Sequence, residues 1–260
     1  MKGAGQMRGV LTAAAVLVGA LCYAGETGKE AVTLVTADGA KVAGYFVKGR
    51  GEKTAAVVLL HRFGGSKEDW NSITEKYLSE PTGYAILAID LRGHGETLLM
   101  DEKGKRTGQF GEEGFGEMTR DTEAAVKWLR AREDIDGDRI AIVGADIGAN
   151  VALEYATGDS GIKCIGLLSP GITYKGIKAL ARAKEYGARP MLLAASREDA
   201  QAAKSIRGLA EASAGEEVIL VFDGNLHGTK MFGRVAIDGP LTAFLKENLE
   251  PATAKEPQAK

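Results

Sequence analysis

Cysteine, histidine and net charge are all scarce in this sequence of 260 residues. It contains two cysteines and three histidines, and none of them has the HxxxH or CxxC spacing typical of a metal site. The formal net charge is −2 and no block of basic residues stands out, which disfavours binding to nucleic acid or to an anionic membrane surface. We therefore expect no metal, no cofactor and no nucleic-acid partner, while the oligomeric state stays open.

The N-terminus carries an apolar run from Val10 to Leu21, preceded by two basic residues and followed by small residues. This order is typical of a secretory signal peptide cleaved after Ala24. The run is shorter than the roughly 18 to 20 apolar residues of a membrane-spanning helix, which makes an uncleaved anchor the weaker interpretation. We expect an exported protein, periplasmic or extracellular, with no stable membrane anchor after cleavage. Cys164 would be its only cysteine, which excludes an intramolecular disulfide.

Apolar runs alternate with helical patterns along the rest of the chain, which predicts a parallel sheet flanked by helices. We expect a signal peptide at 1–24, one α/β domain at 25–250 and a disordered tail at 251–260, where apolar periodicity is lost. Predicted strands lie at 31–36, 41–47, 55–60, 84–90, 139–143, 162–168, 191–195 and 217–222. One predicted helix begins after Ser66. The others lie at 117–132, near 149–156, at 200–212 and at 241–249.

Short polar segments stand where the predicted strands end. HRFGG (61–65) follows the strand 55–60, DLRGHG (90–95) ends the strand 84–90, and GADIG (144–148) follows the strand 139–143. SRED (196–199) and DGNLHG (223–228) follow the last two strands. Because active sites of open α/β sheets form outside the carboxyl ends of the strands, we expect these segments to meet.

GADIG has the pattern of a sharp strand-to-helix turn, in which small residues let the backbone bend and present one side chain above the sheet. The side chain presented here is Asp146, whose carboxylate attacks an alkyl carbon well but an ester carbonyl poorly. We expect the chemistry of the protein to occur at this position.

In these motifs the chain resembles the α/β hydrolase superfamily, in particular small capless members similar to dienelactone hydrolases and secreted serine esterases. The resemblance runs from about Thr33 to Leu249 and includes the family's order of nucleophile, acid and base. It implies an α/β hydrolase fold, with a mostly parallel eight-stranded sheet flanked by helices and no large cap. It also implies a small-molecule substrate.

The resemblance assigns Asp146 as the nucleophile, Asp199 as the acid and His227 as the base. The backbone N–H groups of Phe63 and Ile147 match its oxyanion hole. Elementary chemistry supports the same assignment, because a histidine exchanges protons near neutral pH and a carboxylate behind it fixes its tautomer.

Four further polar residues near these motifs are interpreted as structural. His61 and His94 lie in glycine-rich turns, where side-chain hydrogen bonds to the backbone fix the loop geometry. Asp90 and Arg92 are interpreted as a structural pair beneath the site.

Two residues depart from the pattern of the capless esterases. Asp146 stands in place of the serine of GxSxG, and Arg62 stands where HGxGG has its first glycine. Attack of a carboxylate on an ester gives a mixed anhydride, which is more activated than the ester itself. The same carboxylate displaces a halide or opens an epoxide to give an alkyl ester, which water activated by His227 hydrolyses. Tyr174 is either a proton donor to the opening oxygen or an ordinary half-buried tyrosine.

Three functions remain open from the sequence, one of which is a purely structural envelope protein. The first is an exported hydrolase that acts on a small ester-like or alkyl (halide or epoxide) substrate through an Asp-His-Asp site. The second is a non-catalytic protein that binds a ligand or partner through the former active-site cleft. In that case an ion pair between Arg62 and Asp146 would lower the pKa of the carboxylate and weaken it as a nucleophile.

Overall fold

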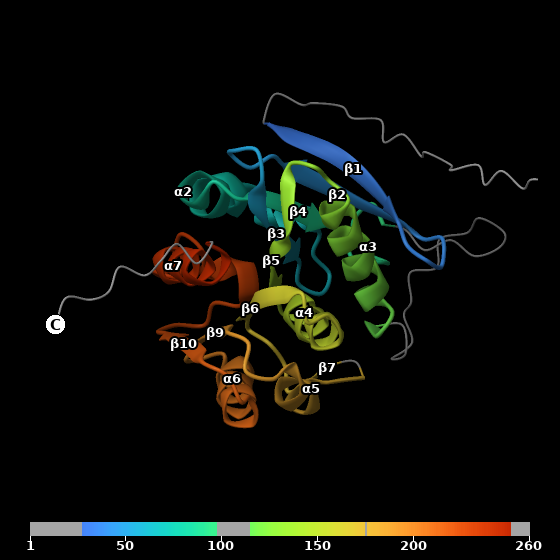
Figure 1. The fold of residues 1–260 in the computed structure, drawn as a ribbon. Coiled ribbons are helices and arrows are strands. Elements are labelled where there is room, and N and C mark those ends of the chain that lie inside the picture. Colours follow the sequence, from blue (N-terminus) through green and yellow to red (C-terminus); the bar gives the residue numbers. More distant parts are fainter. Residues whose placement is uncertain (1–27, 98–114, 175, 251–260) are drawn as a thin grey trace, which may run out of the picture.

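The computed structural model describes residues 28–97, 115–174 and 176–250, and Figure 1 shows their arrangement. The predicted signal peptide (1–24) and the predicted tail (251–260) lie outside the described residues. Within the described ranges, no helix is long and apolar enough to cross a membrane.

Eight strands form one sheet in the order β1-β2-β4-β3-β5-β6-β9-β10. The first two contacts, β1 with β2 and β2 with β4, are antiparallel, and every other contact is parallel. The prediction of a mostly parallel eight-stranded sheet is therefore confirmed. The strands are β1 (Lys29–Val35), β2 (Lys41–Val47), β3 (Thr54–Leu60), β4 (Ala85–Ile89), β5 (Ile135–Ala145), β6 (Ile162–Leu168), β9 (Met191–Ser196) and β10 (Glu217–Phe222).

Helices cover both faces of this sheet (Figure 1). One face packs against α3 (Met118–Arg130), α4 (Ile147–Gly158), α5 (Ala179–Tyr186) and α6 (Ala200–Ala212). The other packs against α7 (Asp238–Leu249) and a composite helical segment made of η1 (Lys67–Trp70), α1 (Asn71–Ile73), the π-helical η2 (Thr74–Ser79) and α2 (Glu80–Thr82). A short 3₁₀ helix, η4 (Gly228–Met231), follows the last strand.

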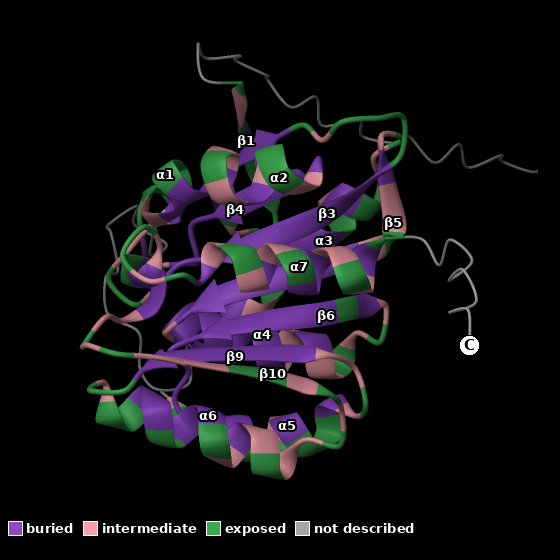
Figure 2. Cartoon of the chain, turned by 90° about the vertical axis from the view of Figure 1, so that its left-hand side faces the viewer, coloured by how far each residue is buried: buried purple, intermediate pink, exposed green. Residues whose placement is uncertain are grey.

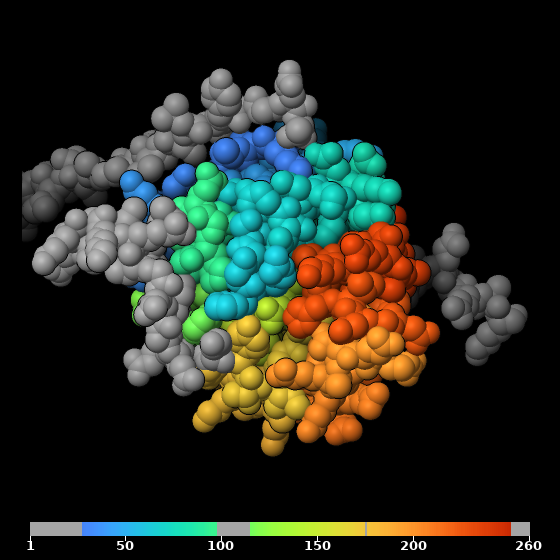
Figure 3. All heavy atoms as spheres, turned by 180° about the vertical axis from the view of Figure 1, so that it is seen from behind, coloured from blue at the N-terminus to red at the C-terminus, as the bar shows by residue number. Residues whose placement is uncertain are grey.

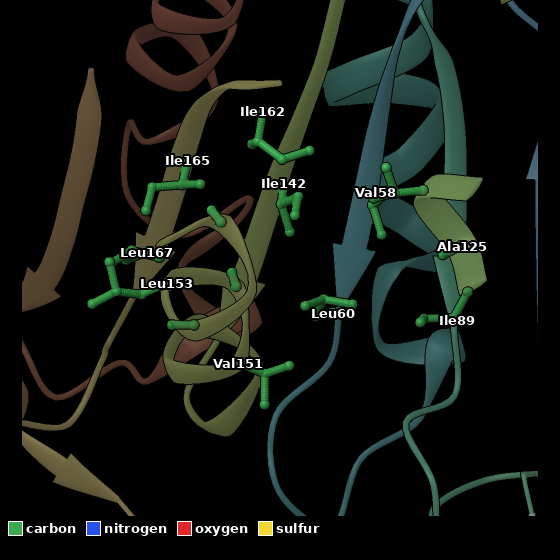
Figure 4. Close-up of a cluster of buried hydrophobic side chains, with 14 of the residues drawn as sticks. Val58, Leu60, Ile89, Ala125, Ile142, Val151, Leu153, Ile162, Ile165 and Leu167 are labelled. Carbon is green, nitrogen blue, oxygen red and sulfur yellow. The ribbon is translucent and has the colours of Figure 1, made fainter. Parts of the chain in front are cut away.

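The central strands are buried on both faces, which explains their nearly continuous apolar sequences. All residues of β3 and β4 are buried, whereas α6 and α7 carry buried residues beside exposed ones (Figure 2). On the face seen in Figure 3, segments from the first third of the chain (cyan) meet segments from its middle (yellow) and its last third (orange and red). The aliphatic core beneath α4 includes Val58, Leu60, Ile142 and Val151 (Figure 4).

The segment between β6 and β9 is short and carries no cap domain among its described residues. It holds a ribbon of two strands, β7 (Thr173–Tyr174) and β8 (Ile177–Lys178), followed by α5. The ribbon was not predicted, because two-residue strands are too short to show an alternating pattern.

Candidate active site

Asp146 occupies a sharp turn between β5 and α4, as the sequence predicts. Its backbone has φ 53° and ψ −115°, a strained conformation for a residue with a side chain. The flanking glycines are required by close packing: a Cβ at Gly144 would lie 2.2 Å from the Gly148 carbonyl oxygen, and one at Gly148 would lie 2.4 Å from that of Leu60. The turn therefore sits tightly against β3, and it holds Asp146 at the carboxyl edge of the sheet.

His227 lies between two carboxylates. Its Nδ1 is 2.5 Å from Asp199 Oδ2, and its Nε2 is 3.6 Å from Asp146 Oδ1. Asp199 is itself fixed at the start of α6, where its side chain accepts a hydrogen bond from the N–H of Ala202. The structure thus brings together the three side chains that the sequence singled out from three separate strand ends.

This arrangement favours the protonated imidazole. The Asp146 carboxylate first, and Asp199 after it, raise the pKa of His227 against the opposing effect of burial. While both carboxylates are ionised, they stabilise the imidazolium form and weaken the ring as a proton acceptor.

The backbone N–H of Phe63, the predicted oxyanion-hole donor, is hydrogen-bonded to the side chain of Asp146. The N–H of Phe63 donates a hydrogen bond to Asp146 Oδ2 over 3.0 Å. The two oxygens of the carboxylate are therefore differently placed, with Oδ2 at the Phe63 N–H and Oδ1 toward His227. Ile147 is the first residue of α4 with its side chain buried, and the role of its N–H as second donor stays a prediction.

A small cavity of about 50 Å³ opens beside the carboxylate. Its volume is far below the roughly 300 to 1,000 Å³ of typical sites for drug-sized ligands. Burial, and then the charge of Asp146, raise the pKa of Tyr174 to about 12, which keeps this phenol protonated. The cavity is lined by Asp146, Ser169, Pro170, Gly171, Tyr174, Asp199, Gln201, Ala202 and His227.

The Arg62 side chain binds Asp69 and the backbone of Phe63, and not Asp146. Its Nε is 3.2 Å from Asp69 Oδ2, and its NH1 donates to the carbonyl oxygen of Phe63 over 3.4 Å. Among the described residues the ion pair with Asp146 that the sequence suggested does not form, and Asp69 takes its place as partner. Asp69 lies on the 3₁₀ helix η1, one turn beyond the loop that carries Arg62.

His61 shapes the loops, as its interpretation from the sequence proposed. Its Nε2 accepts the N–H of Leu91 over 3.0 Å, and its Nδ1 lies 2.7 Å from the carbonyl oxygen of Arg62. Burial lowers the pKa of His61 to about 4, so the ring is neutral. The His94 ring packs against it, with 5.0 Å between centroids.

Asp90 and Arg92 do not pair with each other, which corrects the interpretation of them as a pair. Asp90 accepts hydrogen bonds from the N–H and the ammonium of Lys67, over 2.7 and 2.9 Å. Arg92 binds Asp121 and Asp38 instead. These partners lie 23 or more positions away in the chain, beyond the reach of a sequence pattern.

Ser169 was not singled out by the sequence. It follows β6, lines the cavity and has φ 51°, which makes it and Asp146 the two non-glycine residues with positive φ in the described part of the chain. Its sequence neighbourhood is an ordinary strand end, so no pattern signalled this conformation. Within the described ranges, no three His, Cys, Asp or Glu side chains are grouped so as to hold a metal ion.

Comparisons with known proteins agree with this architecture. The model of the alpha/beta hydrolase family matches residues 57–250. Among curated proteins, the putative hydrolase YtaP of Bacillus subtilis (strain 168) is 30% identical over 150 residues, which cover 50% of this chain and 48% of that protein. The chain thus matches about half the length of this curated relative.

Solved structures share the fold at low sequence identity. An esterase of Pyrococcus furiosus superimposes with a TM-score of 0.69 at 20% identity, over 85% of this chain and 93% of that chain. A dienelactone hydrolase of Anabaena variabilis gives a TM-score of 0.66 at 18% identity, over 85% of this chain and 98% of that chain.

Proposed function

The chain belongs to the alpha/beta hydrolase family, and from that premise we propose that it hydrolyses small alkyl substrates, halides or epoxides, through a covalent ester on Asp146. The observation that carries this proposal is the hydrogen bond from the Phe63 N–H to Asp146 Oδ2.

This contact favours an alkyl substrate over an ester. In ester hydrolysis the hole must stabilise the oxygen of the substrate carbonyl. Here Asp146 Oδ2 already accepts the hydrogen bond of the Phe63 N–H. The hole is therefore set to stabilise an oxyanion on the carboxyl carbon of Asp146 itself, which forms when water attacks an alkyl ester at that residue.

In the first step, Asp146 Oδ1 forms a bond to the substrate carbon. The carbon–halogen bond breaks and releases halide, or the epoxide carbon–oxygen bond breaks and leaves an alkoxide. The phenol of Tyr174, protonated and within the same cavity, supplies the proton for that alkoxide and regains one from water.

In the second step, His227 becomes a base because alkylation removes the negative charge of Asp146. That charge is the first cause of the raised His227 pKa, so its loss lowers the pKa and favours the neutral ring, whose proton passes to solvent. The neutral imidazole then accepts a proton from water, whose oxygen attacks the carboxyl carbon of Asp146. The Phe63 N–H stabilises the oxyanion at Oδ2, and collapse of the intermediate expels the alcohol, which receives the proton from His227. The carboxylic acid left on Asp146 then loses its proton to His227 or to solvent, which restores the carboxylate.

Isotope labelling tests this sequence of steps. The purified chain is incubated with chloroalkanes, epoxides and p-nitrophenyl esters in heavy-oxygen water, and the peptide containing Asp146 is analysed by mass spectrometry. We expect label to enter Asp146 with an alkyl substrate and not with the esters. In His227→Gln the alkyl adduct should accumulate, and in Asp146→Asn neither label nor adduct should appear. Absence of label and product across the panel, from a folded protein, would overturn the proposal.

Asp146→Ser gives a second test. The smaller side chain vacates the position of Oδ2, which leaves the Phe63 N–H open to a substrate carbonyl. We expect this variant to gain activity on p-nitrophenyl esters and to lose activity on alkyl substrates.

A ligand-binding function without turnover is the second candidate. It is favoured by the small volume of the cavity beside Asp146. Binding of an unreacted alkyl compound, detected calorimetrically with no product formed, would support it.

We also propose that the protein is exported, on the signal-peptide pattern of residues 1–24. Expression with this segment, followed by N-terminal sequencing of the secreted product, should give Gly25 as the first residue.

A further inference from the structure

Two buried serine hydroxyls hold the backbone on either side of His227. Ser196, the last residue of β9, accepts the N–H of Leu226 through its Oγ over 3.1 Å. Ser169, which follows β6, accepts the N–H of Gly228 through its Oγ over 3.0 Å. Both serines are almost completely shielded from solvent, with exposures of 0% and 2%.

The loop between β10 and η4 needs such support because it leaves the sheet before His227. The N–H groups directly before and after the histidine are bound by these side chains and not by a backbone ladder. Gly228, with φ 56°, also lies close to the end of β5, where a Cβ would come within 3.1 Å of the Ala145 side chain.

We propose that Ser169 and Ser196 are positioning residues that hold the His227 ring between Asp146 and Asp199. Ser196 ends β9 and Ser169 directly follows β6, and these two strands are neighbours in the sheet. Together the two serines fix the His227 loop to the same sheet that carries the turn of Asp146. A shift of the loop would lengthen the Asp146–His227 separation of 3.6 Å or break the 2.5 Å contact with Asp199.

The strain at Ser169 fits this role. A positive φ disfavours residues with a side chain, and glycine would adopt it at no cost. The Ser169 hydroxyl, however, supplies the acceptor for a buried N–H, which glycine lacks. Strain at a residue of this kind persists where the surrounding contacts fix it, and it is frequent at functional sites.

The experiment uses Ser169→Gly and Ser196→Ala. Ser169→Gly removes the hydroxyl and also relieves the positive φ, so it is expected to fold. Ser196→Ala replaces a residue in a strand already rich in alanine. Ser205→Ala is the matched control, because Ser205 is equally buried but its hydroxyl donates within α6, to Gln201.

The primary readout is the pH titration of His227 by NMR, its signal assigned by its absence in His227→Gln. Among the described residues, the charged or titratable groups that face this ring are Asp146 and Asp199, with Tyr174 across the cavity. We expect the pKa of His227 to fall toward its ordinary value in Ser169→Gly and Ser196→Ala, and to stay as in the parent in the control.

The second readout is turnover on the best alkyl substrate, where kcat should fall about 10- to 100-fold in both variants with a smaller change in KM. Ser196→Thr, which keeps a hydroxyl, should restore both readouts. An unchanged His227 titration in folded Ser169→Gly and Ser196→Ala would overturn the inference, and so would an equal shift in Ser205→Ala.

The turnover part rests on the proposed function, whereas the titration does not. If no form of the protein turns over substrate but the titration shifts as expected, the proposed function fails and the positioning role stands. If the parent is active and neither variant alters the titration or kcat, the positioning role fails alone.

Discussion

Replacing Asp146 by Asn removes one of the two negative charges that face His227 and changes little else. The asparagine side-chain oxygen can still accept the Phe63 N–H, so the shape of the turn and of the hole is retained. Because Asp146 is the first cause of the raised His227 pKa, we expect the pKa to fall in this variant.

The size of the effect follows from the geometry. Two unit charges 3.6 Å apart interact by about 1 kcal/mol at the dielectric constant of water and by about 5 kcal/mol at an effective value near 20. The His227 side chain is 41% exposed, which places the pair near the lower figure because solvent screens it. A loss of about 1 to 2 kcal/mol corresponds to a fall of roughly one pKa unit.

The same shift predicts a pH-dependent change in stability. A histidine whose pKa is raised by folding contributes stability below its unfolded pKa, near 6.5, and this contribution disappears as the pH rises through the folded value. The free energy of unfolding of Asp146→Asn should therefore fall below that of the parent by about 1 kcal/mol more at pH 5 than at pH 9.

The assays are an NMR titration of His227 and urea unfolding at the two pH values. Asp223→Asn is the matched control, because Asp223 lies in the same loop but is 92% exposed and paired with Arg197. The reasoning is refuted if the His227 pKa stays or rises in Asp146→Asn, or if Asp223→Asn lowers it by the same amount.

Three further predictions concern groups around the site. Lys67→Met leaves the buried Asp90 carboxylate without its cation, and we expect a loss of about 3 to 5 kcal/mol in the free energy of unfolding in urea. Arg62→Ala removes a partly exposed ion pair with Asp69 and a long hydrogen bond to the Phe63 carbonyl oxygen, so we expect at most about 1 kcal/mol in unfolding and an unchanged His227 pKa; a clear rise of the His227 pKa would contradict the assignment of Asp69 as the partner of Arg62. Cys164 is buried and burial raises the pKa of its thiol, so thiol reagents should label it only in denaturant, and rapid labelling of the native protein would contradict its placement.

The fold was predictable wherever burial dictates the sequence. β3 is apolar at nearly every position because both of its faces are covered, and its short run of small and branched residues favours a buried strand. The helix expected after Ser66 shows the limit of such reasoning. Ser66 makes no capping hydrogen bond, and the first N–H, that of Lys67, is instead accepted by Asp90 from the next strand of the chain. A cap supplied by a distant residue leaves no local pattern.

The candidate site was predictable in its members but not in its contacts. The elbow, Asp199 and His227 follow the ends of β5, β9 and β10, and parallel strands bring those ends to one edge. The partner of Arg62 was not predictable, because either of two carboxylates satisfied the charge argument and only the packing of η1 decides in favour of Asp69. The serine hydroxyls beside His227 were missed for the same reason, since a serine at a strand end is common and its partner lies 30 or more residues away.

The position of Asp146 Oδ2 has the largest consequence for function. A serine at the elbow ends in one oxygen, and the hole beyond it is left for the carbonyl of a substrate. A carboxylate at the same place extends one atom further and carries a second oxygen, which here takes the Phe63 N–H. The oxyanion hole is therefore placed to activate a carbonyl on Asp146 itself, and not the carbonyl of a substrate. Under the proposed function, Asp146 thus commits Phe63 and His227 to the hydrolysis of an alkyl ester on the enzyme and not to acyl transfer from a substrate ester.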